Sequence, residues 1–295
     1  MSMAGGGDAG DEAPFSHGGH EIALLSAGSA VVAVDAVMDG RCDNAYALVR
    51  PPGHHAVAVM GMGFCLYNNI VIAAHHALRH HGDTVRRVAI VDYDVHHGNG
   101  TQDAFYDDPR VLFISLHQDD NYPRPSGKVE ETGAGAGTGY NLNVPLPPGS
   151  GSGAYRATFD RIVAPAVDAF RPDLLLVSSG FDGSFVDPLA QMMLTGEDFR
   201  CFAETIVELA EKHCKGRAVF MHEGGYSDAY VPFCGLAVTE ALAGCRTAVE
   251  DPLLAEANGF GYQALQPWQD AVIAAAEANV NVLRGILARA DGAVA

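Results

Sequence analysis

The sequence predicts an α/β domain in three layers, a parallel sheet with helices on both faces. Several short runs of residues are continuously apolar and rich in β-branched side chains, as in strands that are buried on both faces. Stretches with a helical pattern separate these runs, so strands and helices alternate along the chain. The 295 residues, of which 48% are hydrophobic, are enough to bury one large core.

The strands are predicted from apolar runs of strand length, such as RRVAIVDY and VLFISL. A shorter run leads into the turn Pro51-Pro52-Gly53 and is taken as the first strand. The expected strands, in order, cover Ala45–Val49, Arg87–Tyr93, Val111–Leu116, Leu174–Ser178 and Ala218–Met221.

The helices are predicted between and around these strands. Gly40 ends the first helix, and Thr195 begins a later one that carries acidic residues in its first turn. The last helix is Ala-rich and amphipathic and contains no motif. The expected helices cover Glu21–Met38, Tyr67–His81, 153–170, 195–213, 233–243 and Trp268–Ala290.

Two segments lack such patterns. Residues 1–19 are rich in Gly, Asp and Ala, and we expect a flexible lead-in there, followed by a single catalytic domain over 20–295. Residues 117–152 form the longest irregular stretch, which in a compact domain is usually functional or disordered. The glycines of this stretch do not match GxxxxGK[ST], so a phosphate-binding loop is rejected.

Charge and composition narrow the classes of partner. The formal net charge of −18 argues against direct nucleic-acid binding and favours cationic substrates, although such a charge can also serve only to keep a protein dispersed. No apolar run of membrane-span length and no secretory signal are recognised, so no membrane association is expected. The six cysteines contain no CxxC pair, which favours reduced thiols in the cytoplasm over a four-cysteine zinc site. Homo-oligomerisation is left open.

Polar clusters interrupt the apolar strands at their carboxyl ends. In a parallel α/β sheet, that edge is where ligands bind. Because these ends meet at one edge, we expect the clusters to converge. The four clusters are Gly53-His54-His55, Asp92-Tyr93-Asp94-Val95-His96-His97, Gly180-Phe181-Asp182-Gly183 and Glu223-Gly224-Gly225-Tyr226.

Asp94, His96 and Asp182 are candidate metal ligands. Asp94 and His96 are two residues apart, so in an extended segment their side chains point to the same face. Asp182, at the end of another strand, can supply a third ligand, and three ligands leave the open position that catalytic zinc needs. A single Asp-x-His pattern is more often a strand-end cap than a metal site. Here three further polar clusters are expected at the same edge of the sheet, and they favour the metal site.

His54, His55 and Tyr226 are candidate catalytic residues. Histidine can take a proton from water and give one to a leaving amine near neutral pH. Tyr226 follows two glycines, which let the backbone approach a ligand, and its phenol can donate to a developing oxyanion. Taken alone, these could be turn histidines bonded to backbone and a buried tyrosine. His75-His76 and His80-His81 are predicted to be surface residues of a helix.

The segments PPGHHA, GFCLYNN, DYDVHHGNGTQ, FISLH, GFDGSFVDPL and EGGYS resemble, in order and spacing, those of the histone deacetylase family. The resemblance runs from about Gly18 to Gly244. DYDVHHGNGTQ and NVPLPPGSG resemble the class II branch and the bacterial histone-deacetylase-like amidohydrolases. The resemblance implies an arginase–deacetylase fold and a zinc-dependent amidohydrolase that removes acetyl groups from an acetylated lysine peptide or an acetylated small amine, such as an acetylpolyamine.

The resemblance also implies roles for individual residues. One zinc ion would be held by Asp94, His96 and Asp182, with His54 and His55 as the tandem histidines and Tyr226 as the oxyanion-binding residue. Asp92 matches the carboxylate that orients the first histidine, and Asn99 stands where class I members have an aspartate behind the second. The family also binds a structural K⁺ through backbone carbonyls. The matching positions for the substrate tunnel are Gly63, Phe64, Tyr122 and Leu189, and those for K⁺ are near Asp92, Asp94, His96, Ser115 and Leu116.

Two departures from the family pattern stand out. Only 50 residues precede Pro51, where the family normally has a longer segment with an initial strand and rim loops, so the N-terminal part of the family domain is expected to be missing. Tyr122 replaces a phenylalanine found in many relatives, which would make one tunnel wall more polar.

Two alternatives remain open. An arginase-like ureohydrolase with two metal ions would need further carboxylates, and Gly98 and Ser184 stand where the related DxHxD and SxDxD patterns carry them. A deacetylase-like binding module without activity is the other alternative, although every candidate catalytic residue is retained.

Overall fold

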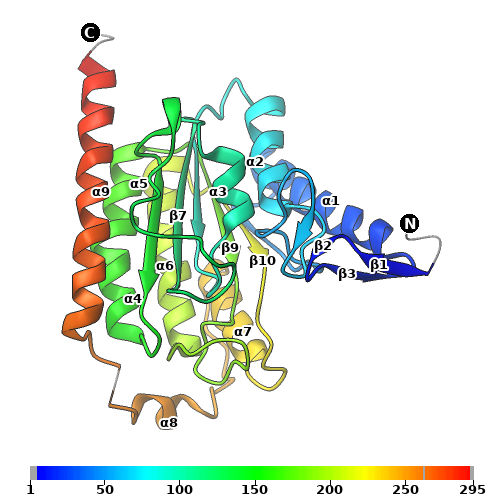
Figure 1. Cartoon of the computed structure of the whole chain (residues 1–295), viewed down its shortest axis with the longest axis vertical. Helices are drawn as coiled ribbons and strands as arrows, with labels where there is room; N and C mark the ends of the chain where they lie inside the picture. The colour runs from blue at the N-terminus through cyan, green and yellow to red at the C-terminus, as the bar shows by residue number, and fades with distance from the viewer. Residues whose placement is uncertain (1–4, 262, 293–295) are drawn as a thin grey trace.

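Six parallel strands form the central sheet of the computed structural model, which describes residues 5–261 and 263–292 (Figure 1). Their order across the sheet is β4-β10-β9-β6-β7-β8. Helices cover both faces, so the predicted α/β architecture is confirmed. The strands are β4 (Asn44–Ala47), β10 (Ala218–His222), β9 (Leu174–Ser179), β6 (Val88–Asp92), β7 (Val111–Gln118) and β8 (Asn141–Leu146).

The central strand β6 explains why the strands read as continuously apolar. All five of its residues are buried. Val88 and Ile90 point into the core on one face of the sheet, whereas Ala89 and Val91 point into the core on the other face. A strand covered by helices on both faces needs apolar side chains at every position. At its end, Asp92 pairs in register with Ser115 of β7 and Ser178 of β9, which aligns the carboxyl ends of these strands.

The helices form the two outer layers (Figure 1). The smaller core contains residues of α1, α2 and α3, and the larger core contains residues of α4 to α7 and α9, with a π-helical turn at Phe159–Val163 joining α4 to α5. The bounds are α1 (Gly19–Met38), α2 (Asn69–His80), α3 (Asn99–Phe105), α4 (Ser152–Thr158), α5 (Ala164–Phe170), α6 (Gly196–Cys214), α7 (Val231–Leu242), α8 (Leu254–Asn258) and α9 (Pro267–Gly292).

The predicted helix start at Thr195 is confirmed by its capping interactions. The backbone N–H of Thr195 donates to Asp198 Oδ2 at 2.8 Å, and the threonine side chain caps the first turn in return. At the start of α2, the Asn68 side chain accepts from the Val71 N–H at 3.1 Å. Both caps satisfy amides that have no partner inside their helix.

The N-terminal segment differs from the expected flexible lead-in. Of residues 1–19, residues 5–19 are described, and they contain β1 (Gly6–Asp8), β2 (Gly10–Asp11) and β3 (Pro14–Ser16). β1 pairs with β3, and β2 pairs with β5 (Gly61–Met62), each pair forming a small sheet apart from the central one. β1 and β2 consist only of glycine and aspartate and are paired through backbone hydrogen bonds, so their composition gave no signal of strands.

The predicted loop over 117–152 also contains a strand. β8 (Asn141–Leu146) pairs with β7 and forms one edge of the sheet. Its sequence NLNVPL includes two asparagines and Pro145, which depart from a typical strand pattern. A proline is tolerated there because an edge strand leaves one side of its backbone without a pairing partner.

The expectation that no apolar run reaches the length of a membrane span is wrong for α1 and α9. By length and composition alone, Gly19–Met38 and Pro267–Ala290 are long and apolar enough to cross one. In the structure, the buried residues of α1, such as Ala30 and Val34, belong to the smaller core, and those of α9, such as Ile273 and Leu283, belong to the larger one. Such packing is typical of helices that cover a sheet.

Candidate metal centre and active site

The four predicted polar clusters lie at the carboxyl edge of the sheet. Asp92 is the last residue of β6, and Asp94 and His96 follow it. Asp182 follows β9, and Glu223 follows β10. His54 reaches this edge from the turn after β4, since its backbone N–H donates to Glu223 Oε2 at 3.1 Å.

Asp94, His96 and Asp182 converge on one buried point. One ligand atom from each lies within 4.8 Å of the others, and all three residues are buried. His96 Nδ1 faces both carboxylates, at 3.2 Å from Asp94 Oδ1 and 3.0 Å from Asp182 Oδ2. The predicted ligand set is therefore brought together by the fold.

Backbone amides fix the two carboxylates. Gly224 N–H donates to Asp94 Oδ2 at 2.7 Å, and Val95 N–H donates to Asp182 Oδ1 at 2.9 Å. A Cβ atom on Gly224 would lie 2.1 Å from Asp182 Oδ2, so only glycine permits this close approach of the backbone. One oxygen of each carboxylate remains turned toward His96.

The electrostatics of these three residues suit a cation. Burial and the charge of Asp94 raise the pKa of Asp182 to about 7. Burial alone would raise the pKa of Asp94, but His54 and His96 hold it below its ordinary value. Two carboxylates that share a buried site repel each other, and a divalent ion between them removes that repulsion. Two carboxylate oxygens and one imidazole nitrogen are donors that zinc accepts, and three protein ligands leave a position open.

The tandem histidines have different partners. His54 Nδ1 donates to Asp92 Oδ2 at 3.0 Å, and His55 Nδ1 donates to Asn99 Oδ1 at 2.8 Å. The two rings lie 4.0 Å apart, and the His55 ring lies 6.0 Å from the His96 ring. Asp92 and Asn99 thus occupy the positions behind the histidines that the sequence predicted.

Glu223 and Ser178 support the first histidine and were not assigned a role from the sequence. Glu223 Oε2 accepts from the N–H groups of Gly53 and His54 at 2.7 and 3.1 Å. Ser178 Oγ donates to the other oxygen, Oε1, at 3.0 Å. Glu223 opens the cluster EGGY, so its place at a strand end was visible in the sequence, but its backbone partners were not.

Tyr226 lies beside the candidate ligands and is held by an aspartate that the sequence analysis missed. Its backbone N–H donates to Asp187 Oδ2 at 2.8 Å, and its ring meets that of Phe64 edge to face at 5.9 Å. Burial, Asp182 and Asp94 raise the pKa of the Tyr226 phenol well above its ordinary value, so it keeps its proton at neutral pH. A protonated phenol is a hydrogen-bond donor.

Of the other predicted tunnel residues, Gly63 and Tyr122 lie beside the His55 ring, and Leu189 lies next to the segment that carries Tyr122. A Cβ atom on Gly63 would lie 2.4 Å from His55 and 2.7 Å from Tyr122, which places Gly63 against both rings. Tyr122 meets the His55 ring edge to face at 5.0 Å. The backbone oxygen of Leu189 accepts from the Asn121 side chain at 3.3 Å, one residue from Tyr122.

The N-terminal segment reaches this rim. The Tyr122 hydroxyl donates to Asp11 Oδ2 at 3.1 Å. The backbone oxygens of Asp11 and Glu12 accept from the N–H groups of Gly63 and Phe64 at 3.0 and 2.8 Å. No sequence motif indicated this contact, because it joins segments about 50 and 110 residues apart through backbone groups and one phenol.

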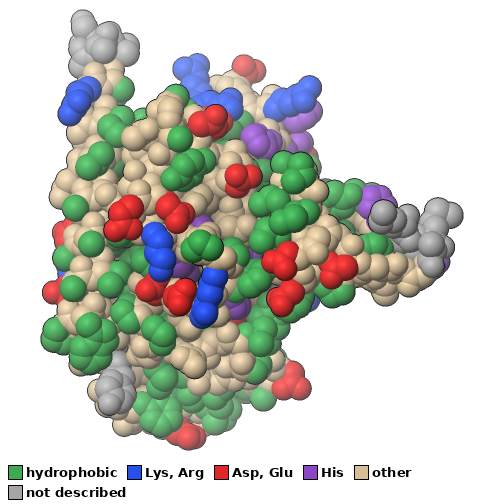
Figure 2. Space-filling view, viewed as in Figure 1, with side chains coloured by type: hydrophobic (Ala, Val, Ile, Leu, Met, Phe, Trp, Pro, Cys, Tyr) green, Lys and Arg blue, Asp and Glu red, His purple; other side chains and the backbone are tan. Residues whose placement is uncertain are grey.

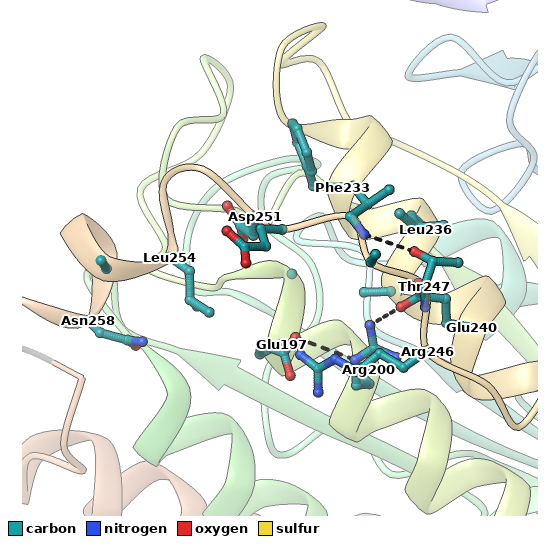
Figure 3. A pocket seen from close by; sticks show the side chains of 16 residues that line it. Glu197, Arg200, Phe233, Leu236, Glu240, Arg246, Thr247, Asp251, Leu254 and Asn258 are labelled. Carbon is teal, nitrogen blue, oxygen red and sulfur yellow. Dashed lines mark hydrogen bonds and ion pairs between the residues drawn. The ribbon is translucent and has the colours of Figure 1, made fainter.

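A separate hollow of about 700 Å³ lies between α6, α7 and the segment 246–258 (Figure 3). It shares no lining residue with the candidate active site. Both of its arginines are paired with glutamates, Arg200 with Glu240 and Arg246 with Glu197. The hollow is therefore separate from the candidate active site at the sheet edge.

Comparisons with known proteins point to one family. The histone deacetylase domain matches residues 2–242. The chain is 54% identical over 253 residues, 86% of its length, to a histone deacetylase-like amidohydrolase of Pseudomonas aeruginosa, and 42% identical over 232 residues, 78% of its length, to a probable deacetylase of Archaeoglobus fulgidus. It spans 66% and 64% of the lengths of these two relatives. The solved structure described as "Crystal Structure of HDA15 HD domain" matches with a TM-score of 0.85 at 30% identity, covering 99% of this chain and 77% of that one.

Proposed function

The chain belongs to the histone deacetylase family, and we propose that it is a zinc-dependent amidohydrolase that removes acetyl groups from N-acetylated amines. The observation that carries the proposal is the convergence of Asp94, His96 and Asp182 beside two buried histidines and a protonated phenol. Asp94, His96 and Asp182 would hold the metal ion. When bound, zinc supplies Lewis-acid activation of water and of the amide carbonyl.

His55 is the group that moves the proton. Its Nδ1 faces Asn99 Oδ1, while the Asn99 amide nitrogen donates to the His55 backbone oxygen at 3.3 Å. This pair of bonds fixes the asparagine oxygen toward the ring, so Nδ1 carries the hydrogen and Nε2 has a free lone pair. His55 Nε2 can accept a proton from water and return it to the departing amine.

His54 and Tyr226 stabilise charge rather than accept protons. Asp92 and Asp94 both face the His54 ring, at 3.0 and 3.7 Å, and favour its charged form. Tyr226, anchored by Asp187, offers a hydroxyl to the carbonyl oxygen as that oxygen gains negative charge. Gly63, Phe64, Tyr122 and Leu189 would form the walls around the acylated side chain.

The proposed substrate is a cationic acylated amine. Asp11 and Glu12 are exposed and bound through their backbones to the rim residues Gly63 and Phe64. They add negative charge at the entrance of a chain whose net charge is −18. An acetylated lysine within a basic peptide and an acetylpolyamine both carry the matching positive charge.

A panel of substrates tests this proposal. Acetyl-lysine peptides flanked by Lys or by Glu, an acetylpolyamine and a simple acetate ester would be compared at fixed zinc occupancy. The proposal expects the amides to be hydrolysed, with a higher kcat/KM for the Lys-flanked peptide or the acetylpolyamine than for the Glu-flanked peptide. Hydrolysis of the ester alone, or a preference for the Glu-flanked peptide, would contradict it.

His55→Ala tests the proposed proton transfer within the same assay. General acid–base groups contribute about 10²–10⁴-fold, so kcat should fall by that order while the metal content stays unchanged. A loss of less than about tenfold would remove His55 from this role.

The two other functions have less support. A second metal ion would need further carboxylates, whereas Gly98 is crowded against Asp92, and Ser184 offers only a hydroxyl. An inactive binding module would not require the complete set of hydrogen-bonded histidines, ligands and phenol. Structural K⁺ binding, a cytoplasmic location and self-association stay predictions.

A further inference from the structure

A second group of metal-ligating side chains lies where α1 meets α2. His76 Nε2 and His81 Nε2 both approach the same atom, Asp35 Oδ1, at 2.6 and 2.8 Å. Together with the candidate active site, this is one of the two groups of three convergent ligand residues found among the described residues. The sequence predicts both histidines as surface residues, whereas in the structure both are half-buried.

The group lies far from the candidate active site along the helices. Near the carboxyl edge of the sheet, α1 and α2 meet at Ser26 and Asn69, whose side chains are bonded to each other and to Pro51. Asp35 lies nine residues further along α1, and His76 and His81 lie near the other end of α2. In Figure 2 histidine side chains gather over that end of α2.

The surroundings leave the group open on one side. The side chains of His76 and His81 are 18% and 19% exposed, and that of Asp35 is 34% exposed. The residues beneath it, Val34 and Ala77, belong to the core between the helices and the sheet. The three side chains are thus anchored on two packed helices while solvent can still supply further ligands.

The geometry is close to that of a metal centre. Zinc with bond lengths of about 2.0–2.1 Å holds tetrahedral ligand atoms about 3.3 Å apart. From their present distances of 2.6 and 2.8 Å to Asp35 Oδ1, His76 and His81 would need to move away by about 0.7 and about 0.5 Å to reach that separation, shifts within the range of side-chain torsions. Two imidazoles and one carboxylate form a donor set that divalent transition metals bind.

We propose that Asp35, His76 and His81 form a second site for a divalent transition metal, with Zn²⁺ as the ion it binds. The site joins the end of α1 to the end of α2, so the bound ion stabilises the packing of these two helices. Water completes the coordination on the exposed side. Because its ligands are separate from those at the sheet edge, this site does not depend on the proposed catalytic activity.

Neighbouring histidines provide matched controls for the ligand assignment. His80 adjoins His81, is exposed, and only stacks its ring on that of His76 at 4.6 Å. His75 adjoins His76 but turns toward Phe105, with ring centres 5.0 Å apart. Replacing either with Gln removes one imidazole from the same stretch of chain and leaves all three proposed ligands in place.

Equilibrium dialysis of the full chain against Zn²⁺ alone tests the site. Bound zinc would be measured for wild type, His81→Gln, Asp35→Asn, His80→Gln and His75→Gln. Wild type, His80→Gln and His75→Gln should bind one more equivalent than His81→Gln and Asp35→Asn. In His81→Gln and Asp35→Asn, the affinity for zinc at this site should fall at least about tenfold. Loss of a residue that only hydrogen-bonds to a metal ligand already has an effect of that size. Circular dichroism without metal checks that each variant is folded.

The outcomes separate this site from other sources of zinc binding. Equal zinc in wild type, His81→Gln and Asp35→Asn would overturn the proposal. If His80→Gln lost the equivalent while Asp35→Asn kept it, the ion would be held by an exposed pair of histidines one turn apart, and the proposed ligand set would be wrong. If zinc failed to bind at the sheet edge, wild type and all four variants would each bind one equivalent less than expected. The difference between wild type and His81→Gln would remain.

Discussion

His54 and His55 are neighbours in the chain, yet their surroundings favour opposite charge states. Burial alone would lower the pKa of His54, but Asp94, Asp92 and Glu223 raise it well above its ordinary value. Burial and the adjacent His54 and His96 lower the pKa of His55. The sequence identified the two residues as a pair. The different roles proposed for them rest on the carboxylate behind one ring and the amide behind the other.

Tyr226→Phe removes the proposed oxyanion donor while keeping the ring. Loss of one such donor costs about 10²–10³ in kcat, so turnover of acetyl-lysine should fall by that order. Trifluoroacetyl-lysine should keep a larger fraction of its turnover, because its carbonyl is electrophilic enough to need less stabilisation. Both substrates would be assayed at equal zinc content. An equal fractional loss on both would argue against the oxyanion role, and no loss on either would make Tyr226 structural.

Phe64→Ala tests the tunnel wall. Phe64 is 38% exposed, and its ring meets that of Tyr226. Removal of the ring should weaken binding of linear acyl-lysine analogues, which pass along the wall, more than binding of small hydroxamates, which reach only the metal. Inhibition constants for the two classes would measure this. Equal losses for both classes would place Phe64 outside the tunnel.

At the scale of elements, the sequence revealed those that bury apolar side chains on both faces. β6 and β9 were predicted within one or two residues, because the first four residues of each are apolar and every position in both is buried. β8 was missed because its asparagines depart from the apolar pattern of a buried strand. The amide groups of Asn141 and Asn143 donate to Gln102 and to backbone oxygens of the preceding loop. β2 and β5 were missed because their pairing rests on backbone bonds alone.

The ion pair between Arg200 of α6 and Glu240 of α7 should make the stability of the fold depend on pH in the acid range. Hydrogen bonds from Thr247 and Arg200 lower the pKa of Glu240 from 4.5 to about 2. A carboxylate whose pKa is lower in the folded state than in the unfolded state stabilises the fold fully at a pH above the unfolded-state pKa. This stabilisation is lost as the pH falls through the folded-state pKa. Glu240→Gln should therefore lower Tm at pH 7, and the difference from wild type should shrink as the pH falls from 4.5 toward 2.

Thermal unfolding of wild type, Glu240→Gln and Glu208→Gln across this pH range measures the effect. Glu208 is an exposed residue of α6, so its variant controls for the loss of one negative charge. A Tm difference for Glu240→Gln that stayed constant from pH 7 to pH 3 would mean that this ion pair does not stabilise the fold.

For the whole molecule, the parallel sheet is what assembles the site. His54, Asp94, Asp182 and Tyr226 come from four segments spread over more than 170 residues, and each follows a different strand. The alignment of strand ends was predictable, since parallel strands bring their carboxyl ends to one edge. The rim contact between Asp11 and Tyr122 was not predictable, because it depends on how an irregular N-terminal segment folds back over the edge.

The central claim is that Asp94, His96 and Asp182 hold the zinc ion that activates the reaction. The most direct test measures zinc content and acetyl-lysine turnover together in wild type, Asp182→Ala and Asp160→Ala, the last being an exposed aspartate that serves as the control. Asp182→Ala should lose one equivalent of zinc relative to the other two proteins. Its turnover should fall at least about 10³-fold, since metal activation supplies several kcal/mol. An Asp182→Ala protein with wild-type zinc content and wild-type turnover would contradict the account.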